Sequence, residues 1–202
     1  SRLGVRFIHV ELHWLRYRNL VPYREHWASV KGTGKLELAL APQLIADFCG
    51  FNSDGGMDEE LYWTNDLTLD FTVNIEEATE KSQLLIELVE GFRTVRCQVN
   101  PVTGMADIAV ISRELDPATP TSETVASVQT GIQGPGEYNI SFANVDDRLC
   151  LWVDDDLIPL GDKASFQSAG LNLPTELDLA PMGIAVNQLK AVVSNLVIHR
   201  DI

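Results

Sequence analysis

The sequence contains little cysteine, and its cysteines are too few and too far apart to build a covalent scaffold. They are Cys49, Cys97 and Cys150, in a chain of 202 residues. An odd number at such wide spacing gives neither a disulfide framework nor a paired-cysteine metal site. Because Cys97 and Cys150 fall in strand-like segments, we expect both to act as small buried hydrophobes. Whether any two of the three form a disulfide stays open.

The chain is also poor in basic residues. It has 15 lysines and arginines against 29 aspartates and glutamates, which gives a formal net charge of −14. A polyanion has no electrostatic attraction for the phosphates of a nucleic acid or for an anionic membrane surface. We therefore expect no nucleic-acid partner. The excess of acid indicates a solvated surface, associated cations or a neutral ligand.

Long hydrophobic runs are absent as well. No run of about 18 apolar residues exists, so no segment of this sequence is expected to span a membrane. No signal peptide is recognisable at the start. The chain opens inside a strand-like pattern without an initiator Met and stops abruptly after Ile202. We therefore expect a domain excised from a longer protein, with any membrane attachment in the missing parts of that parent.

Motifs of common enzymes are missing too. The sequence has no GxSxG elbow, no P-loop and no GxGxxG. Glycoside hydrolases need two carboxylates about 5–10 Å apart. Glu87 and Glu90 fall on opposite faces of one strand, and Asp70 has only Asp66 as an acidic neighbour on its own face. We expect this segment to be non-catalytic, and a glycoside hydrolase-like sandwich acting on a glycan is the alternative.

What the chain does contain is a series of short strands. The clearest runs from Asp66 to Ile75, where apolar and polar residues alternate with period two. Further strands are expected at Arg6–Trp14, Lys35–Leu40, Gln83–Glu90, Gly91–Val99, Met105–Arg113, Glu137–Ala143, Gly183–Val186 and Val192–His199. Many short strands separated by turns are typical of an antiparallel sandwich, and residues 1–202 are expected to form a single domain.

Few segments depart from this strand pattern. Only Pro22–Val30 and Glu76–Lys81 have the composition of short helices. Thr119–Thr124 is polar and contains a proline, so we expect a loop there. Pro159–Pro181 has scattered Gly, Ser and Pro and is expected to be an irregular loop with a short helical turn.

The segment from Phe142 to Ile158 predicts a β-hairpin. Leu149, Leu151 and Val153 alternate with polar positions, and Asp154-Asp155-Asp156 supplies turn residues. This hairpin resembles the signature of concanavalin A-like jelly rolls, a superfold that includes laminin-G-like, lectin-like and glycanase-like domains. The resemblance implies an all-β, concanavalin A-like jelly-roll sandwich of two antiparallel sheets. Such sandwiches serve both as binding modules and as enzymes.

Two aromatic residues are candidates for ligand binding. Trp152 lies on the polar side of its strand, opposite Leu151 and Val153, where its ring could stack on a ligand. Tyr138 is the second candidate, although in a regular strand its side chain points to the same face as that of Ile140. Only a bulge would turn it outward. A core position is the competing interpretation for both residues.

Three segments have the composition of metal sites. His9, Glu11 and His13 share one face of a continuous strand and are ligand types for zinc or iron, with a solvated polar face as the alternative. The acidic segments Asp54–Glu60 and Asp154–Asp156 offer oxygen ligands for calcium, with solvated loops as the alternative.

Three further segments suggest a family. Trp14–Trp27, Trp63–Asp70 and Val193–Ile202 resemble, together with the hairpin, a domain inserted in planctomycete-type signal peptidase I-like proteins. The nucleophile and lysine segments of such peptidases do not occur here, so no catalytic residue carries over.

The resemblance implies a function and a location. It implies a non-catalytic accessory recognition or interaction domain of a signal peptidase I-like membrane protein. Such a domain would lie on the extracytoplasmic, periplasmic side and be tethered through its parent. Its partner would be the peptidase body, a glycan or a peptide. A carbohydrate-binding sandwich is the alternative.

Overall fold

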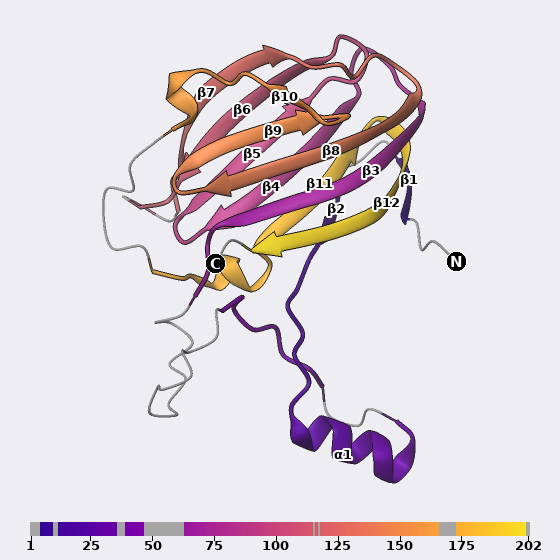
Figure 1. Cartoon of the computed structure of the whole chain (residues 1–202), viewed down its shortest axis with the longest axis vertical. Coiled ribbons are helices and arrows are strands. Elements are labelled where there is room, and N and C mark those ends of the chain that lie inside the picture. Colours follow the sequence, from indigo (N-terminus) through magenta and orange to yellow (C-terminus); the bar gives the residue numbers. More distant parts are fainter. Residues whose placement is uncertain are drawn as a thin grey trace.

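The chain forms a sandwich of two β-sheets. The computed structural model describes residues 5–9, 12–35, 39–46, 63–114, 116, 118–165 and 173–200. These residues form two six-stranded sheets in which neighbouring strands are antiparallel, stacked face to face (Figure 1). The predicted all-β sandwich of two antiparallel sheets is confirmed.

Each sheet combines strands from both ends of the sequence. Sheet A contains, in spatial order, β1 (Val5–His9), β12 (Leu189–Arg200), β3 (Leu67–Glu77), β8 (Gly136–Val145), β9 (Arg148–Val153) and β10 (Asp156–Ile158). Sheet B contains β2 (His13–Arg16), β11 (Met182–Asn187), β4 (Gln83–Glu90), β5 (Arg93–Val99), β6 (Met105–Ser112) and β7 (Thr121–Gln129). Two short 3₁₀ helices, η1 (Asp162–Ala164) and η2 (Glu176–Leu179), lie in the connections after β10.

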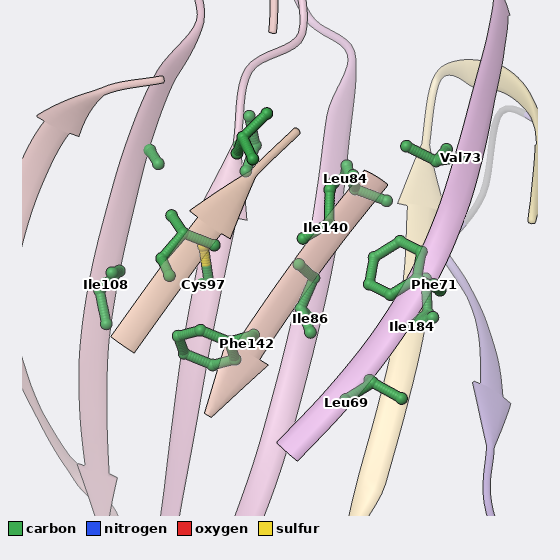
Figure 2. Close-up of a cluster of buried hydrophobic side chains, with 14 of the residues drawn as sticks. Leu69, Phe71, Val73, Leu84, Ile86, Cys97, Ile108, Ile140, Phe142 and Ile184 are labelled. Carbon is green, nitrogen blue, oxygen red and sulfur yellow. The ribbon is translucent and has the colours of Figure 1, made fainter. Parts of the chain in front are cut away.

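The core lies between the sheets and follows directly from the alternation in the strands. In β3, the residues Leu67, Leu69, Phe71, Val73 and Ile75 are all at most 3% exposed. Figure 2 shows members of this row meeting side chains from β8 and from the strands of sheet B. Strands that alternate in this way present their remaining side chains on the outer face of the sandwich.

Cys97 is the buried hydrophobe that the sequence predicts, whereas Cys150 alternates with the core residues of β9 and is not fully buried. Cys97 is buried and Cys150 half-buried, and neither forms a disulfide. Burial raises the pKa of the Cys97 thiol to about 12, and the nearby Asp107 carboxylate acts in the same direction. Cys97 therefore packs as an apolar side chain (Figure 2). Cys49 lies outside the described residues.

Two tight turns connect β8, β9 and β10. Asp146 and Asp147 have φ values of 50° and 57°, and Asp154 and Asp155 have 51° and 68°. Positive φ at both central residues is the geometry of a two-residue hairpin turn, and aspartate tolerates it. The predicted turn at Asp154 is confirmed, and the preceding Asp–Asp pair forms a second turn of the same kind.

Other sequence-based expectations need correction. Residues from Thr121 onward belong to β7, an edge strand of sheet B, and not to a loop. The strand is polar because it lies at the edge and is largely exposed. Glu76–Lys81 is not a helix, because β3 continues to Glu77 and a turn follows. The other predicted helix exists as α1 (Arg24–Thr33).

Helix α1 lies apart from the two sheets (Figure 1). None of its ten residues is buried, and it ends at Gly34, whose φ of 72° is the left-handed conformation that glycine adopts easily. Among the described residues, no helix is long and apolar enough to cross a membrane.

The predicted continuous strand from Arg6 to Trp14 is also divided. β1 pairs with β12 in sheet A, whereas β2 pairs with β11 in sheet B. His9 ends the first of these strands and His13 begins the second. His9 and His13 therefore belong to strands of different sheets, and the expectation of one continuous strand through both is wrong.

Candidate functional site

A groove of about 560 Å³ crosses the outer face of sheet A. Its floor comes from the polar positions of β3 and β8, which alternate with the core residues of the same strands. The lining residues are Thr68, Asp70, Phe71, Thr72, Asn139, Ile140, Ser141, Trp152, Asp155 and Asn195. The groove therefore combines hydroxyl, amide and carboxylate groups with one large aromatic ring.

Trp152 lies at one side of this groove. It is opposite Ser141 in the pairing of β9 with β8, and Ser141 is opposite Asp70 in the pairing of β8 with β3. The three side chains therefore form one row across three strands. Trp152 is half-buried, and its neighbour Leu157 on β10 is 57% exposed. The ring thus remains partly accessible on the outer face, and the competing core position is not what the structure shows.

Asp70 is held from two sides. The Ser141 hydroxyl donates a hydrogen bond to one carboxylate oxygen, and Nε2 of His199 lies 2.9 Å from the other. The Asp70 side chain is 39% exposed. Contacts of this kind fix the direction of the carboxylate, so that its remaining lone pairs can accept hydrogen bonds from a ligand.

A β-bulge brings Asn195 to the same groove. The register between β12 and β3 shifts between Ser194 and Val197, and Asn195 has a φ of 52°. Its Nδ2 donates to Oγ1 of Thr72 at 3.1 Å, and Thr72 in turn donates to Oδ1 of Asn139 at 2.9 Å. Bulges often redirect a side chain next to a binding site. The polar floor is therefore a connected and oriented set of groups.

The other aromatic candidate, Tyr138, faces the interior. It is half-buried and packs against the core. Its hydroxyl donates to the carbonyl of Gly134 and accepts from the backbone N–H of Gln133, each at 3.2 Å. The Tyr138 side chain therefore points to the same face as that of Ile140, as strand alternation predicts. Its hydroxyl is hydrogen-bonded to two residues of the preceding loop.

Only some of the residues predicted to bind a metal ion lie in the described part of the chain. The side chain of His9, Glu11 and the segment Asp54–Glu60 lie outside the described residues, while His13 is exposed on β2. In the Asp154–Asp156 turn, Oδ1 of Asp154 accepts the backbone N–H of Asn139 at 2.8 Å. Within the described part of the chain, no three His, Cys, Asp or Glu side chains are grouped closely enough to hold a metal ion.

The acidic residues of β4 take different roles. Glu90 points inward and accepts hydrogen bonds from the side-chain amides of Asn65 at 2.7 Å and Asn144 at 2.8 Å. Glu87 points outward and pairs with Arg16 and Arg96. The two carboxylates therefore lie on opposite faces of the strand, as predicted, and do not form a facing pair.

A third buried acid, Asp178, has a structural role. It accepts hydrogen bonds from the backbone N–H groups of Gly91 at 3.0 Å and Thr175 at 2.7 Å, which joins η2 to the β4–β5 turn. Burial raises the pKa of Asp178 above its ordinary 3.8, despite the opposing effect of these hydrogen bonds.

This buried acid predicts a specific pH dependence. A carboxyl whose pKa is raised by folding stabilises the folded state below its ordinary value, and this contribution is lost as the pH rises through the raised value. The melting temperature of the native chain minus that of Asp178→Asn should therefore increase on acidification from about pH 7 to about pH 4. Thermal melts of both proteins check this. If the melting-temperature difference decreases on acidification, folding lowers the pKa of Asp178 and does not raise it.

The chain was compared with known families, curated proteins and solved structures. No family model and no curated protein matches its sequence. Among solved structures, the carbohydrate-binding module CBM66 from Bacillus subtilis is 13% identical, with 67% of this chain and 75% of that chain covered and a TM-score of 0.48. Galectin LEC-6 from Caenorhabditis elegans is 10% identical, with coverages of 66% and 84% and a TM-score of 0.41. Sheep galectin-11 is 10% identical, with coverages of 67% and 91% and a TM-score of 0.40.

Proposed function

We propose that this domain binds a neutral glycan in the groove on the outer face of sheet A, with Trp152 as the aromatic platform. The observation that carries the proposal is the row formed by Trp152, Ser141 and Asp70, in which a partly accessible ring lies beside fixed hydrogen-bonding groups. A sugar presents apolar C–H faces and many hydroxyls, so it matches an aromatic ring flanked by polar side chains.

The charge of the groove favours a neutral ligand. Asp70 and Asp155 line it, and the chain as a whole carries a net charge of −14. Carboxylates accept hydrogen bonds from sugar hydroxyls but repel uronic acids and sulfated sugars. The groove itself, and not the distant likeness to lectin-like sandwiches, carries this proposal.

Exchanging the groove carboxylate should weaken this binding. Asp70→Asn removes the charged acceptor and its attraction for His199, so affinity for a neutral glycan should fall about three- to tenfold. Asp107→Asn, an exposed exchange on β6 of the other sheet, is the matched control and should change affinity little. Isothermal titration with a glycan selected on a neutral-glycan array measures both. Equal losses in the two variants would contradict a site at Asp70.

We also propose, from the sequence resemblance alone, that the domain is an accessory module of a signal peptidase I-like membrane protein on the extracytoplasmic side. The test is the sequence of the complete gene product. A membrane helix and a Ser-containing peptidase segment upstream are expected, with the lysine segment on either side of the domain. A parent that lacks these peptidase segments would overturn this placement without affecting the groove.

A further inference from the structure

A second cluster of aromatic and charged side chains lies on the outer face of sheet B, on the opposite side of the sandwich from the groove. It consists of Trp14, Arg16, Glu87 and Arg96, and we call it the Trp14–arginine cluster. Arg16 is opposite Gly183 in the pairing of β2 with β11, and Gly183 is opposite Glu87 in the pairing of β11 with β4. Glu87 is opposite Arg96 on β5, so the cluster spans four strands.

Gly183 makes the cluster possible. A Cβ atom at this position would lie only 2.8 Å from Nη1 of Arg16 and 2.9 Å from its Cδ and Cζ atoms. The Arg16 side chain therefore lies directly over the backbone of β11 on its way to Glu87. Any larger residue at position 183 would therefore displace the Arg16 guanidinium from its place beside Glu87.

The buried carboxylate fixes both arginines. Glu87 is 2% exposed and pairs with Nη2 of Arg16, and with Nε of Arg96 at 2.6 Å and Nη2 of Arg96 at 2.5 Å. The Arg16 guanidinium also lies 4.0 Å from the centre of the Trp14 ring, and that of Arg96 lies 6.0 Å from it. The two guanidinium groups are thus oriented before any ligand arrives.

Within the described part of the chain, Glu87 takes only a minority of the N–H donors of these two arginines. Each guanidinium has five N–H donors, and Glu87 takes one from Arg16 and two from Arg96. The Arg16 and Arg96 side chains are 31% and 38% exposed. With two cations and one anion, the cluster carries a net positive charge on a chain whose total is −14.

We propose that the Trp14–arginine cluster binds the carboxylate of an acidic glycan. A planar guanidinium with a free N–H edge is the side chain best suited to a carboxylate, and fixing it in advance lowers the entropy lost on binding. That the carboxylate belongs to a sugar rests on the proposed function. The two faces of the sandwich would then select different ligands, a neutral glycan on sheet A and an acidic one on sheet B.

The four tryptophans of the chain make the two sites separately measurable. In a ¹⁵N-labelled protein, trigalacturonate should shift the indole N–H signal of Trp14 and leave that of Trp152 in place. Trigalactose, its neutral counterpart, tests whether the Trp14 response needs the carboxylates. A Trp14 signal that ignores trigalacturonate, or that responds equally to both sugars, would overturn the acidic site. Failure of the groove would instead appear as a Trp152 signal that no neutral glycan moves.

Substitution of Arg96 tests whether this arginine binds the ligand or only stabilises the fold through its ion pair with Glu87. Arg96→Gln should weaken trigalacturonate binding at least about tenfold. The matched control is Arg113→Gln, because Arg113 donates to Thr94 on the same face at 2.9 Å but lies outside the cluster. If Arg96→Gln melts early, Arg96→Lys keeps a charge beside Glu87 and should still bind several-fold more weakly. Equal losses in Arg96→Gln and Arg113→Gln, or tighter binding of a glutamate-rich peptide than of trigalacturonate, would overturn the proposal.

Discussion

Trp152→Ala is expected to weaken the binding of a neutral glycan at least about tenfold. The ring lies in the same row as Ser141 and Asp70, so its loss removes the apolar platform and leaves the polar floor in place. Trp152 is half-buried on the outer face and is not among the buried core residues. Its removal should therefore change the melting temperature much less than it changes affinity.

The chain offers a matched control for this exchange. Trp27 is 56% exposed on α1, which lies apart from the sheets, so Trp27→Ala removes the same kind of side chain far from the groove (Figure 1). Titrating both variants and the native chain with the same neutral glycan measures the difference. Retention of native affinity by Trp152→Ala, or an equal loss in Trp27→Ala, would show that the ring does not form the site.

Phe142→Ala is expected to give the largest loss of stability. Phe142 is fully buried in β8 and meets side chains from both sheets (Figure 2). Truncating a buried phenylalanine removes its hydrophobic contacts and leaves a cavity, at a cost of about 3–5 kcal/mol. In a domain of this size, the melting temperature should fall by roughly 10 °C or more.

Phe92→Ala serves as the control for this experiment. Phe92 lies in the turn between β4 and β5 and is 39% exposed, so its truncation leaves no closed cavity. Thermal and urea unfolding of the two variants should differ by several kcal/mol in the free energy of unfolding. Similar values for both would contradict a single core centred between the sheets.

Sequence reasoning succeeded where one strand carries its own signal. The alternation in Asp66–Ile75 predicted β3, and the expected strands Gln83–Glu90 and Gly91–Val99 correspond to β4 and β5. Alternation offered an outward position for Trp152 beside a core position, and the structure places it on the outer face. These features depend on residues that are close together in the chain.

Features that depend on pairing between distant strands were not predictable. The bulge that turns Asn195 toward Thr72 arises from the register of β12 against β3, and so does the contact of His199 with Asp70. The sheet change between β1 and β2 was missed because alternation continues across it in the sequence. The Trp14–arginine cluster was missed because β2, which carries Trp14 and Arg16, is far in the sequence from β4 and β5 and lies beside β4 only through β11.

The most direct test of the glycan-binding groove is the indole N–H spectrum of the ¹⁵N-labelled chain during titration with a neutral glycan selected on an array. The four tryptophans give four indole signals that single substitutions can assign. A groove with Trp152 as its aromatic platform predicts that the Trp152 signal shifts in a saturable manner while the Trp27 signal stays in place. A Trp152 signal that stays fixed while the glycan binds, or an array on which no neutral glycan binds, would contradict the proposed site.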